Sequence, residues 1–441
     1  MWEFAVLGAL AAGSGMVWAF GENRKILNGW REAVESCGLR IDQISGSVSL
    51  YFRLDASDGP IQVRIRATRQ KNFGGLRVVI RFDGPPGFSE IRIRKEVGGV
   101  QRKLREIELG DPAFDQAFLI QGPIRLVSAL LDAETRRLLL DIHEACRGVE
   151  IGEGEIRAEM LPVQLGILMP LMMDAARRLA RPMEVRSRLT ENARQDPESG
   201  VRLQNVLLLA REQPEAADSL AALHLACSDP SPWVRLGAAV ELGPAGRETL
   251  LQLADTRGDD ALSAKAVTHL GRGLPFERAY DLLVASLRWR RLNTARACLQ
   301  AIAASGVAGA VEILAGVLDR ESGDLAAAAA LALGTVGDPG AEPALIRALG
   351  NENADIPVAA AQALGRVGTA DAVLPLKEAA ARRDADLRRA ARQAIAEIQS
   401  RLPGASQGQL SLAQAEAGQL SIAEAEAGQL SVADSTSARI V

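Results

Sequence analysis

Two stretches, "DPESGVRLQNVLLL" (residues 196–209) and "DPSPWVRLGAAVEL" (residues 229–242), decide the fold of this 441-residue chain. Both begin with Asp-Pro, carry Val-Arg at the same internal position and continue as an apolar run, and they start 33 residues apart. Further along, "AAAALALGTVGD" (327–338) and "VAAAQALGRVGT" (358–369) repeat after 31 residues. Fixed periods of this size are typical of an α-solenoid.

Each repeat supplies a helix, a turn that carries Asp or Asn, and a second, alanine-rich helix that ends at glycine. We expect the aspartate to cap the second helix, alanine to permit close helix contact, and the terminal glycine to adopt the left-handed conformation. The pattern predicts about seven helix pairs over residues 184–402.

These repeats resemble HEAT repeats, in particular the short Ala- and Gly-rich kind that also occurs in phycobilin lyases. The resemblance implies an all-α solenoid and names no single activity. The matching residues are Asp229, Val234, Arg235, Ala238, Ala239, Leu242, Gly243, Ala360, Ala361, Leu364, Gly365, Asp384, Leu387, Arg388 and Ala391.

One repeat departs from this pattern. Residues 276–306 lack the aspartate of the turn and carry Arg288, Trp289, Arg290 and Arg291 instead. Because Trp and Arg are common anchors of protein interfaces, these four residues are candidates for binding a partner. The alternative is an irregular joint in which Trp289 fills a gap between neighbouring repeats.

The region before the array changes to a period of two. Runs at 47–55, 61–69, 75–82 and 90–95 alternate apolar with polar residues and are separated by Gly- and Pro-rich turns, which predicts antiparallel strands with one wet face. A last hairpin is expected in "GVEIGEGEIRAEM" (148–160). We therefore predict a mixed α+β domain over residues 21–183.

The wet face of these strands is rich in arginine. Residues 53–105 hold thirteen Lys or Arg against five Asp or Glu. Such a face could contact anionic lipid headgroups, or it could be a solvated face whose arginines pair with the acidic stretch at residues 105–111. The candidate contact residues are Arg64, Arg66, Arg77, Arg81, Arg92 and Arg94.

Residues 25–180 also resemble an uncharacterised family of bacterial membrane-anchored domains, which implies no known activity. The residues that carry this resemblance are Asp111, Pro112, Phe114, Asp115, Phe118, Leu130, Leu131 and Glu134. We expect Phe114 and Phe118 to pack into the core and Asp111 to cap the turn.

The first twenty residues predict a transmembrane anchor. Residues 4–20 are uncharged, Trp2 and Trp18 flank them, and Arg24, Lys25 and Arg31 follow. This pattern indicates a single-pass protein whose bulk is cytoplasmic. A cleaved signal peptide is the alternative, although a basic first segment is missing.

The composition and the motifs of the sequence narrow the classes of function that the chain could have. The formal charge of -4 gives no overall field for nucleic acid, and the four cysteines and three histidines are scattered. A site made of His143 and Cys146 is a weak alternative, because zinc needs three or four ligands. No nucleotide-binding, hydrolase or metalloprotease motif is found, so we expect no cofactor, metal or catalytic residue.

The last segment, residues 403–441, contains three decapeptides that begin Gly-Gln-Leu-Ser, which reads as a disordered repeated tail. The leading hypothesis is a membrane-tethered, non-catalytic scaffold that binds an unknown protein partner on its solenoid. One alternative is a ligand-binding or enzymatic module, such as a chromophore lyase. Another is a structural protein that assembles through its anchor and tail.

Overall fold

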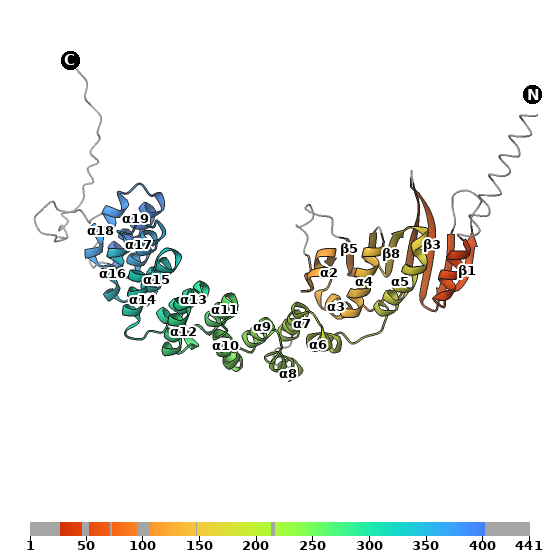
Figure 1. Ribbon diagram of the computed structural model, residues 1–441, viewed down its shortest axis with the longest axis horizontal. Coiled ribbons are helices and arrows are strands. Elements are labelled where there is room, and N and C mark those ends of the chain that lie inside the picture. Colours follow the sequence, from red (N-terminus) through yellow and green to blue (C-terminus); the bar gives the residue numbers. More distant parts are fainter. Residues whose placement is uncertain are drawn as a thin grey trace, which may run out of the picture. The chain divides into compact units, whose positions relative to one another are not determined.

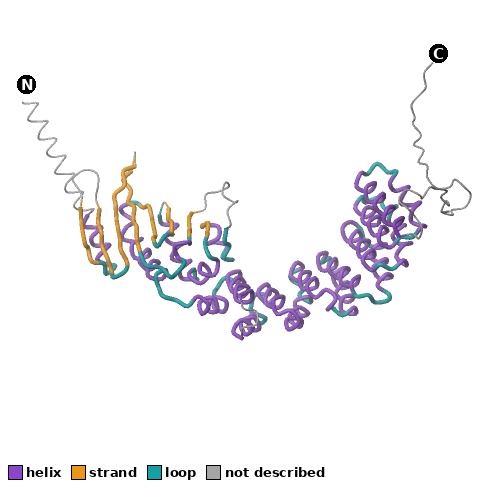
Figure 2. The backbone as a smooth tube through the Cα atoms, turned by 180° about the vertical axis from the view of Figure 1, so that it is seen from behind, coloured by secondary structure: helices purple, strands orange, loops and turns teal. Residues whose placement is uncertain are grey.

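The computed structural model describes residues 27–45, 53–70, 73–95, 106–146, 148–212 and 217–401. The chain divides into two compact units, Met1–Thr249 and Leu250–Val441. The first unit holds a β-sheet and helices, whereas the described residues of the second are helical (Figures 1 and 2).

The sheet of the first unit has eight strands in the order β1-β2-β3-β4-β8-β7-β5-β6, and each neighbouring pair is antiparallel. The four expected runs correspond to β2 to β5, and the expected hairpin to β7 and β8. The two edge strands, β1 and β6, were not predicted. The strands are β1 Arg40–Ser45, β2 Arg53–Asp58, β3 Ile61–Gln70, β4 Phe73–Arg81, β5 Arg92–Lys95, β6 Phe118–Gln121, β7 Gly148–Gly152 and β8 Glu155–Met160.

Helices cover one face of this sheet and leave the other open. Ile65 and Ile80 point into the covered face and are fully buried, as are Leu168 and Met172 of α5, which belong to the same core. Figure 1 shows α4 and α5 in front of the strands, and Figure 2, seen from behind, shows the strands in front. The described helices of this domain are a helix over residues 27–36, α2 Pro112–Ala117, α3 Ile124–Leu130, α4 Ala133–Ala145 and α5 Leu165–Leu179.

The segment around Asp111 forms much as expected. Its carboxylate accepts a hydrogen bond from the Phe114 backbone N–H and caps α2. Phe118 does not continue this helix but begins β6, and both rings are buried with their centroids 4.8 Å apart. The predicted packing is therefore confirmed, although a helix and a strand provide it.

A buried arginine joins the sheet domain to the first helix pair. Arg136 of α4 is only 2% exposed. Its guanidinium donates to Asp111 Oδ2 at 2.7 Å and to both carboxylate oxygens of Asp196 at 2.9 Å. Asp196 lies in the turn between α6 and α7, so this ion-pair cluster fixes the start of the array against α2 and α4.

The array consists of seven helix pairs within the described residues, each a first helix followed by a second helix. The arginine of one repeated motif links the first pair to the second, because Arg202 donates two hydrogen bonds to Asp229 at 2.8 Å. The pairs are α6 Val185–Gln195 and α7 Ser199–Glu212, α8 Ala217–Ala226 and α9 Pro232–Leu242, α10 Arg247–Ala254 and α11 Asp260–Leu270, α12 Phe276–Arg288 and α13 Leu292–Ala304, α14 Ala310–Arg320 and α15 Gly323–Val336, α16 Glu342–Ala348 and α17 Asp355–Val367, and α18 Val373–Ala380 and α19 Ala385–Arg401.

The expectations about helix ends hold at some helices and fail at others. Asp259 caps α11 by accepting the Leu262 backbone N–H, and Asp384 accepts the Leu387 backbone N–H at the start of α19, as predicted. Asp229 does not cap α9, whose N-cap is Ser231; it accepts hydrogen bonds from the Ser231 backbone N–H and the Arg202 side chain instead. Gly337 is left-handed at φ 76°, as predicted, but Gly368 has φ −64°. A side chain at Gly368 would meet the Leu364 carbonyl oxygen, so close backbone packing explains this glycine.

The prediction of a transmembrane helix is corrected. None of the helices in the described ranges combines the length and apolar character needed to cross a membrane. Residues 4–20, where this helix was expected, lie outside those ranges, as do the decapeptide repeats of residues 403–441. The localisation expected from the first twenty residues stays a prediction.

Candidate functional site

The first candidate surface is the open face of the sheet, where the strand register aligns arginines side by side. Arg66 of β3 lies directly opposite Arg53 of β2 and Arg77 of β4. Like charges in opposite positions repel one another. The outer two are neutralised, Arg53 by Asp55 at 2.5 Å and Arg77 by Glu159 at 2.6 Å.

All six arginines predicted for an anionic surface lie on this open face. Arg64 pairs with Asp55, Arg81 with Glu155 and Arg92 with Glu153. Arg66 and Arg94 are exposed. The arginines that pair therefore use carboxylates of neighbouring strands and of the β7–β8 turn, rather than the acidic stretch at residues 105–111.

The arginines on this face lower the pKa of two neighbouring carboxyl groups. Burial alone would raise the pKa of the Asp55 carboxyl, but hydrogen bonds from Arg53 and Arg64 outweigh it and leave the pKa below its ordinary value. Glu155 shows the same balance between burial and its bonds to Arg81 and Arg157, and its pKa is lowered too. Part of the face is hollowed by about 550 Å³ beside Arg40, Arg53 and Arg64.

The second candidate surface lies at the turn between α12 and α13. Trp289 is 62% exposed, which rules out the alternative that it fills a gap between repeats. The Arg288 guanidinium carbon lies 5.5 Å from the centre of the Trp289 ring, a cation–π contact. Arg290 is exposed and has a left-handed backbone with φ 55°.

Arg291 differs from the three residues before it. It is 8% exposed and donates to the Thr256 carbonyl at 2.7 Å and to Ser286 Oγ at 3.2 Å. The structure thus places Arg288, Trp289 and Arg290 on the surface and Arg291 inside, where it holds the turn.

Sequence reasoning missed three apolar neighbours of this turn. Tyr280 and Val284 are spaced i, i+4 on α12 and are 42% and 47% exposed, and Leu292 at the start of α13 is 43% exposed. The signal was present, because Tyr280, Val284 and Arg288 share a helical face at spacings of four. We call Tyr280, Val284, Arg288, Trp289 and Leu292 the α12 patch.

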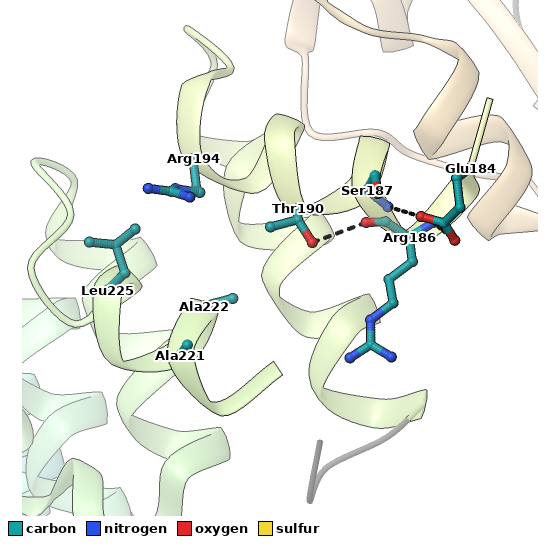
Figure 3. A pocket seen from close by; sticks show the side chains of 8 residues that line it. All are labelled: Glu184, Arg186, Ser187, Thr190, Arg194, Ala221, Ala222 and Leu225. Atoms are coloured by element: carbon teal, nitrogen blue, oxygen red, sulfur yellow. Dashed lines mark hydrogen bonds between the residues drawn. The ribbon is translucent and has the colours of Figure 1, made fainter. Parts of the chain in front are cut away.

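A third feature is a hollow of about 670 Å³ between α6 and α8. Figure 3 shows Ala221, Ala222 and Leu225 of α8 on one side and side chains of α6 on the other. Its lining mixes Arg194 with small side chains, and Thr190 and Glu184 already bond to backbone groups of α6. It offers no convergent set of polar groups for a ligand.

The local pair of His143 and Cys146 does not form a metal site. His143 packs edge-on against Phe118 with centroids 5.0 Å apart, and burial lowers its pKa. Within the described ranges, no group of three or more His, Cys, Asp and Glu side chains is arranged to hold a metal ion.

Comparisons with known proteins bear on the array. The family model described as HEAT repeats matches residues 317–396. No curated protein matches the chain in sequence. The membrane-anchored family expected for residues 25–180 is not supported by these comparisons.

Three solved structures give the scale of the structural likeness. Human deoxyhypusine hydroxylase is 17% identical over 49% of this chain and 96% of its own, with a TM-score of 0.24. The complex of CpcE and CpcF of phycocyanin lyase from Nostoc sp. is 18% identical over 50% of this chain and 90% of its own, with a TM-score of 0.30. An engineered protein is 19% identical over 49% of this chain and 98% of its own, with a TM-score of 0.28. Residues 317–396 of the helical array match HEAT repeats, and the 31-residue period of the sequence runs through this part of the array.

Proposed function

We propose that this protein is a non-catalytic HEAT-repeat scaffold that binds a protein partner on its solenoid surface. The observation that carries the proposal is the α12 patch, in which Trp289 is 62% exposed to solvent and Tyr280, Val284 and Leu292, on the helices either side of the turn, are exposed as well. Folding gains nothing from leaving such a ring in water, so its exposure is better explained by a second surface that covers it.

The exposed residues of α12 share one face of the helix. Tyr280, Val284 and Arg288 follow one another at spacings of four residues, and Arg288 stacks on Trp289. Trp, Tyr and Arg are the residues that dominate binding energies at interfaces. A partner that fits would present an apolar centre to Trp289 and acidic groups to Arg288 and Arg290.

The proposal is tested by affinity capture with the full chain as bait, comparing wild type with Trp289→Ala by quantitative mass spectrometry. Leu374→Ala is the matched control, because Leu374 is also apolar and 48% exposed but lies on α18. A partner retained by wild type and the control should be depleted by about tenfold or more with Trp289→Ala, as expected for an interface anchor. Equal capture by all three baits would refute the role of the patch.

A further inference from the structure

The second helices of the last four repeats present one repeated set of positions that are exposed, except for the half-buried Ala327 and Val358. Helices α13, α15, α17 and α19 pack each on the next, and Figure 1 shows them along one side of their unit with the first helices along the other. Three positions on each helix recur at a spacing of 31 residues, and we call them the ladder. They are Asn293, Arg296 and Gln300, then Asp324, Ala327 and Leu331, then Asp355, Val358 and Gln362, then Asp386, Arg389 and Gln393.

These positions line real depressions. A hollow of about 570 Å³ between α13 and α15 is bordered by Arg296, Gln300, Asp324 and Leu331. An equivalent hollow of about 280 Å³ lies between α17 and α19. It is bordered by Asp355, Val358, Gln362, Asp386, Arg389 and Gln393. The two hollows therefore use the same ladder positions of different repeats.

The third position of the ladder carries an amide on three of the four helices. A glutamine amide offers both donors and an acceptor, which match the N–H and C=O groups of a peptide backbone. Gln300 and Gln362 are exposed and form no side-chain hydrogen bond with any other described residue, whereas Gln393 donates to Glu397 at 2.9 Å. On the remaining helix, α15, the third position is Leu331, which is 39% exposed and offers an apolar contact instead of an amide.

The spacing fits an extended chain. Packed helices lie about 8–10 Å apart, and an extended peptide advances about 3.3 Å per residue. Each helix would therefore meet every third residue of a peptide that crosses the ladder. An amphipathic helix is a poorer fit, because it needs a continuous apolar groove and the ladder offers only Ala327, Leu331 and Val358 among polar positions.

Charge selects the side chains of that peptide. Asp324 pairs with Arg296 at 3.4 Å and Asp386 with Arg389 at 2.5 Å. Asp355, in the same row, is exposed and has no ion-pair partner among the described residues. An unpaired carboxylate between two neutralised ones favours a basic side chain of the ligand at that point.

We infer that the ladder binds an extended peptide segment of a partner protein, with a lysine or arginine opposite Asp355 and an apolar side chain on Leu331. This inference rests on the proposed scaffold function and adds a second surface, distinct from the α12 patch, with the chemistry of its ligand. The glutamines hold the peptide backbone, and Asp355 supplies the preference for a basic residue.

The test pans a random dodecapeptide phage library on the immobilised full chain and measures the affinity of enriched peptides by fluorescence anisotropy. We expect enriched sequences with a basic residue and an apolar residue about four positions apart, because Leu331 and Asp355 lie on neighbouring helices and at ladder positions seven residues apart along them. The double variant Gln362→Ala, Gln393→Ala should weaken binding about tenfold, as loss of two backbone contacts implies. Asp355→Lys should weaken it similarly and favour acidic peptides.

Matched controls lie on the first helices of the same unit. Gln252→Ala on α10 and Asp281→Lys on α12 change the same exposed side chains away from the ladder and should leave peptide affinity unchanged. Failure to enrich any peptide, or enriched peptides whose affinity ignores the ladder variants, overturns the inference. Peptides lost with Trp289→Ala but kept by the ladder variants would overturn the ladder while leaving the scaffold proposal standing.

Discussion

Arg136 and Asp196 form a two-pronged ion pair that is buried on both sides, with the arginine side chain 2% and the aspartate side chain 1% exposed. Burial opposes the charged form of Arg136, but the hydrogen bonds that it donates to Asp196 and Asp111 prevail and raise its pKa above the ordinary value. The pair connects α4 of the sheet domain with the first turn of the array, which are 60 residues apart in the sequence.

Removing this arginine should destabilise the first unit strongly. In Arg136→Met the carboxylates of Asp111 and Asp196 stay buried without their cation, which typically costs about 3–5 kcal/mol. The midpoint of urea unfolding, followed by circular dichroism of the full chain, measures the change. Arg137→Met is the matched control, since this neighbour is exposed and pairs only with Glu134 on the surface, and it should leave the midpoint unchanged. Equal shifts for the two variants would contradict the buried pair as the link.

Glycines at the 31-residue period set the closeness of the second helices. A Cβ built on Gly334 of α15 would lie 2.8 Å from Ala363 Cα of α17. Gly334→Ala should therefore force the two helices apart and cost about 1–3 kcal/mol. Thermal unfolding of the full chain gives the measurement.

Gly316 of α14 provides the control for Gly334. A Cβ added at Gly316 would meet only the end of the flexible Arg320 side chain. Gly316→Ala should be neutral or stabilise by about 0.4–1 kcal/mol, because alanine restricts the unfolded chain. The packing explanation fails if Gly334→Ala is tolerated as well as Gly316→Ala.

Much of this architecture could be predicted from the sequence because its signals are periodic. The 31-residue spacing predicts the helix pairs, and the alternation of apolar with polar residues predicts that Arg64 and Arg81 lie on the same open face of the sheet. The partners of those arginines could not be predicted, because Arg81 and Glu155 are 74 residues apart and meet only through the order of strands β4 and β8. Arg136 gave no local signal at all, since its two carboxylates come from separate turns.

The candidate surface at α12 was predicted in part. Arg288, Trp289 and Arg290 stood out by their break from the repeat, and they lie on the surface. Arg291 looked the same in sequence, yet its carbonyl partner Thr256 lies 35 residues earlier and draws it inside. A run of like residues does not reveal which of them the turn buries.

Low pH should destabilise the sheet domain, because protonation of Glu155 removes its ion pairs with Arg81 and Arg157 on the open face. Its pKa lies below the ordinary value of 4.5 in the folded protein, so its stabilising contribution is present above that value and is lost as pH falls through the lowered pKa. The melting temperature of wild type should thus drop more steeply than that of Glu155→Gln below about pH 4.5. Glu248→Gln on α10 is the control, because it removes a carboxylate elsewhere. Parallel pH curves for wild type and Glu155→Gln would contradict this origin.

The backbone of Arg290 supplies the last prediction. Its φ of 55° lies in the left-handed region, where a side chain other than glycine is strained by about 1 kcal/mol. Arg290→Gly should relieve that strain and raise the free energy of unfolding by about 0.5–1 kcal/mol, whereas Arg290→Ala keeps the Cβ and should not. Thermal unfolding of both variants separates backbone strain from the loss of the charge, which the two substitutions share. If alanine stabilises as much as glycine, repulsion among Arg288, Arg290 and Arg291 is the better explanation, and the left-handed turn is not the source of strain.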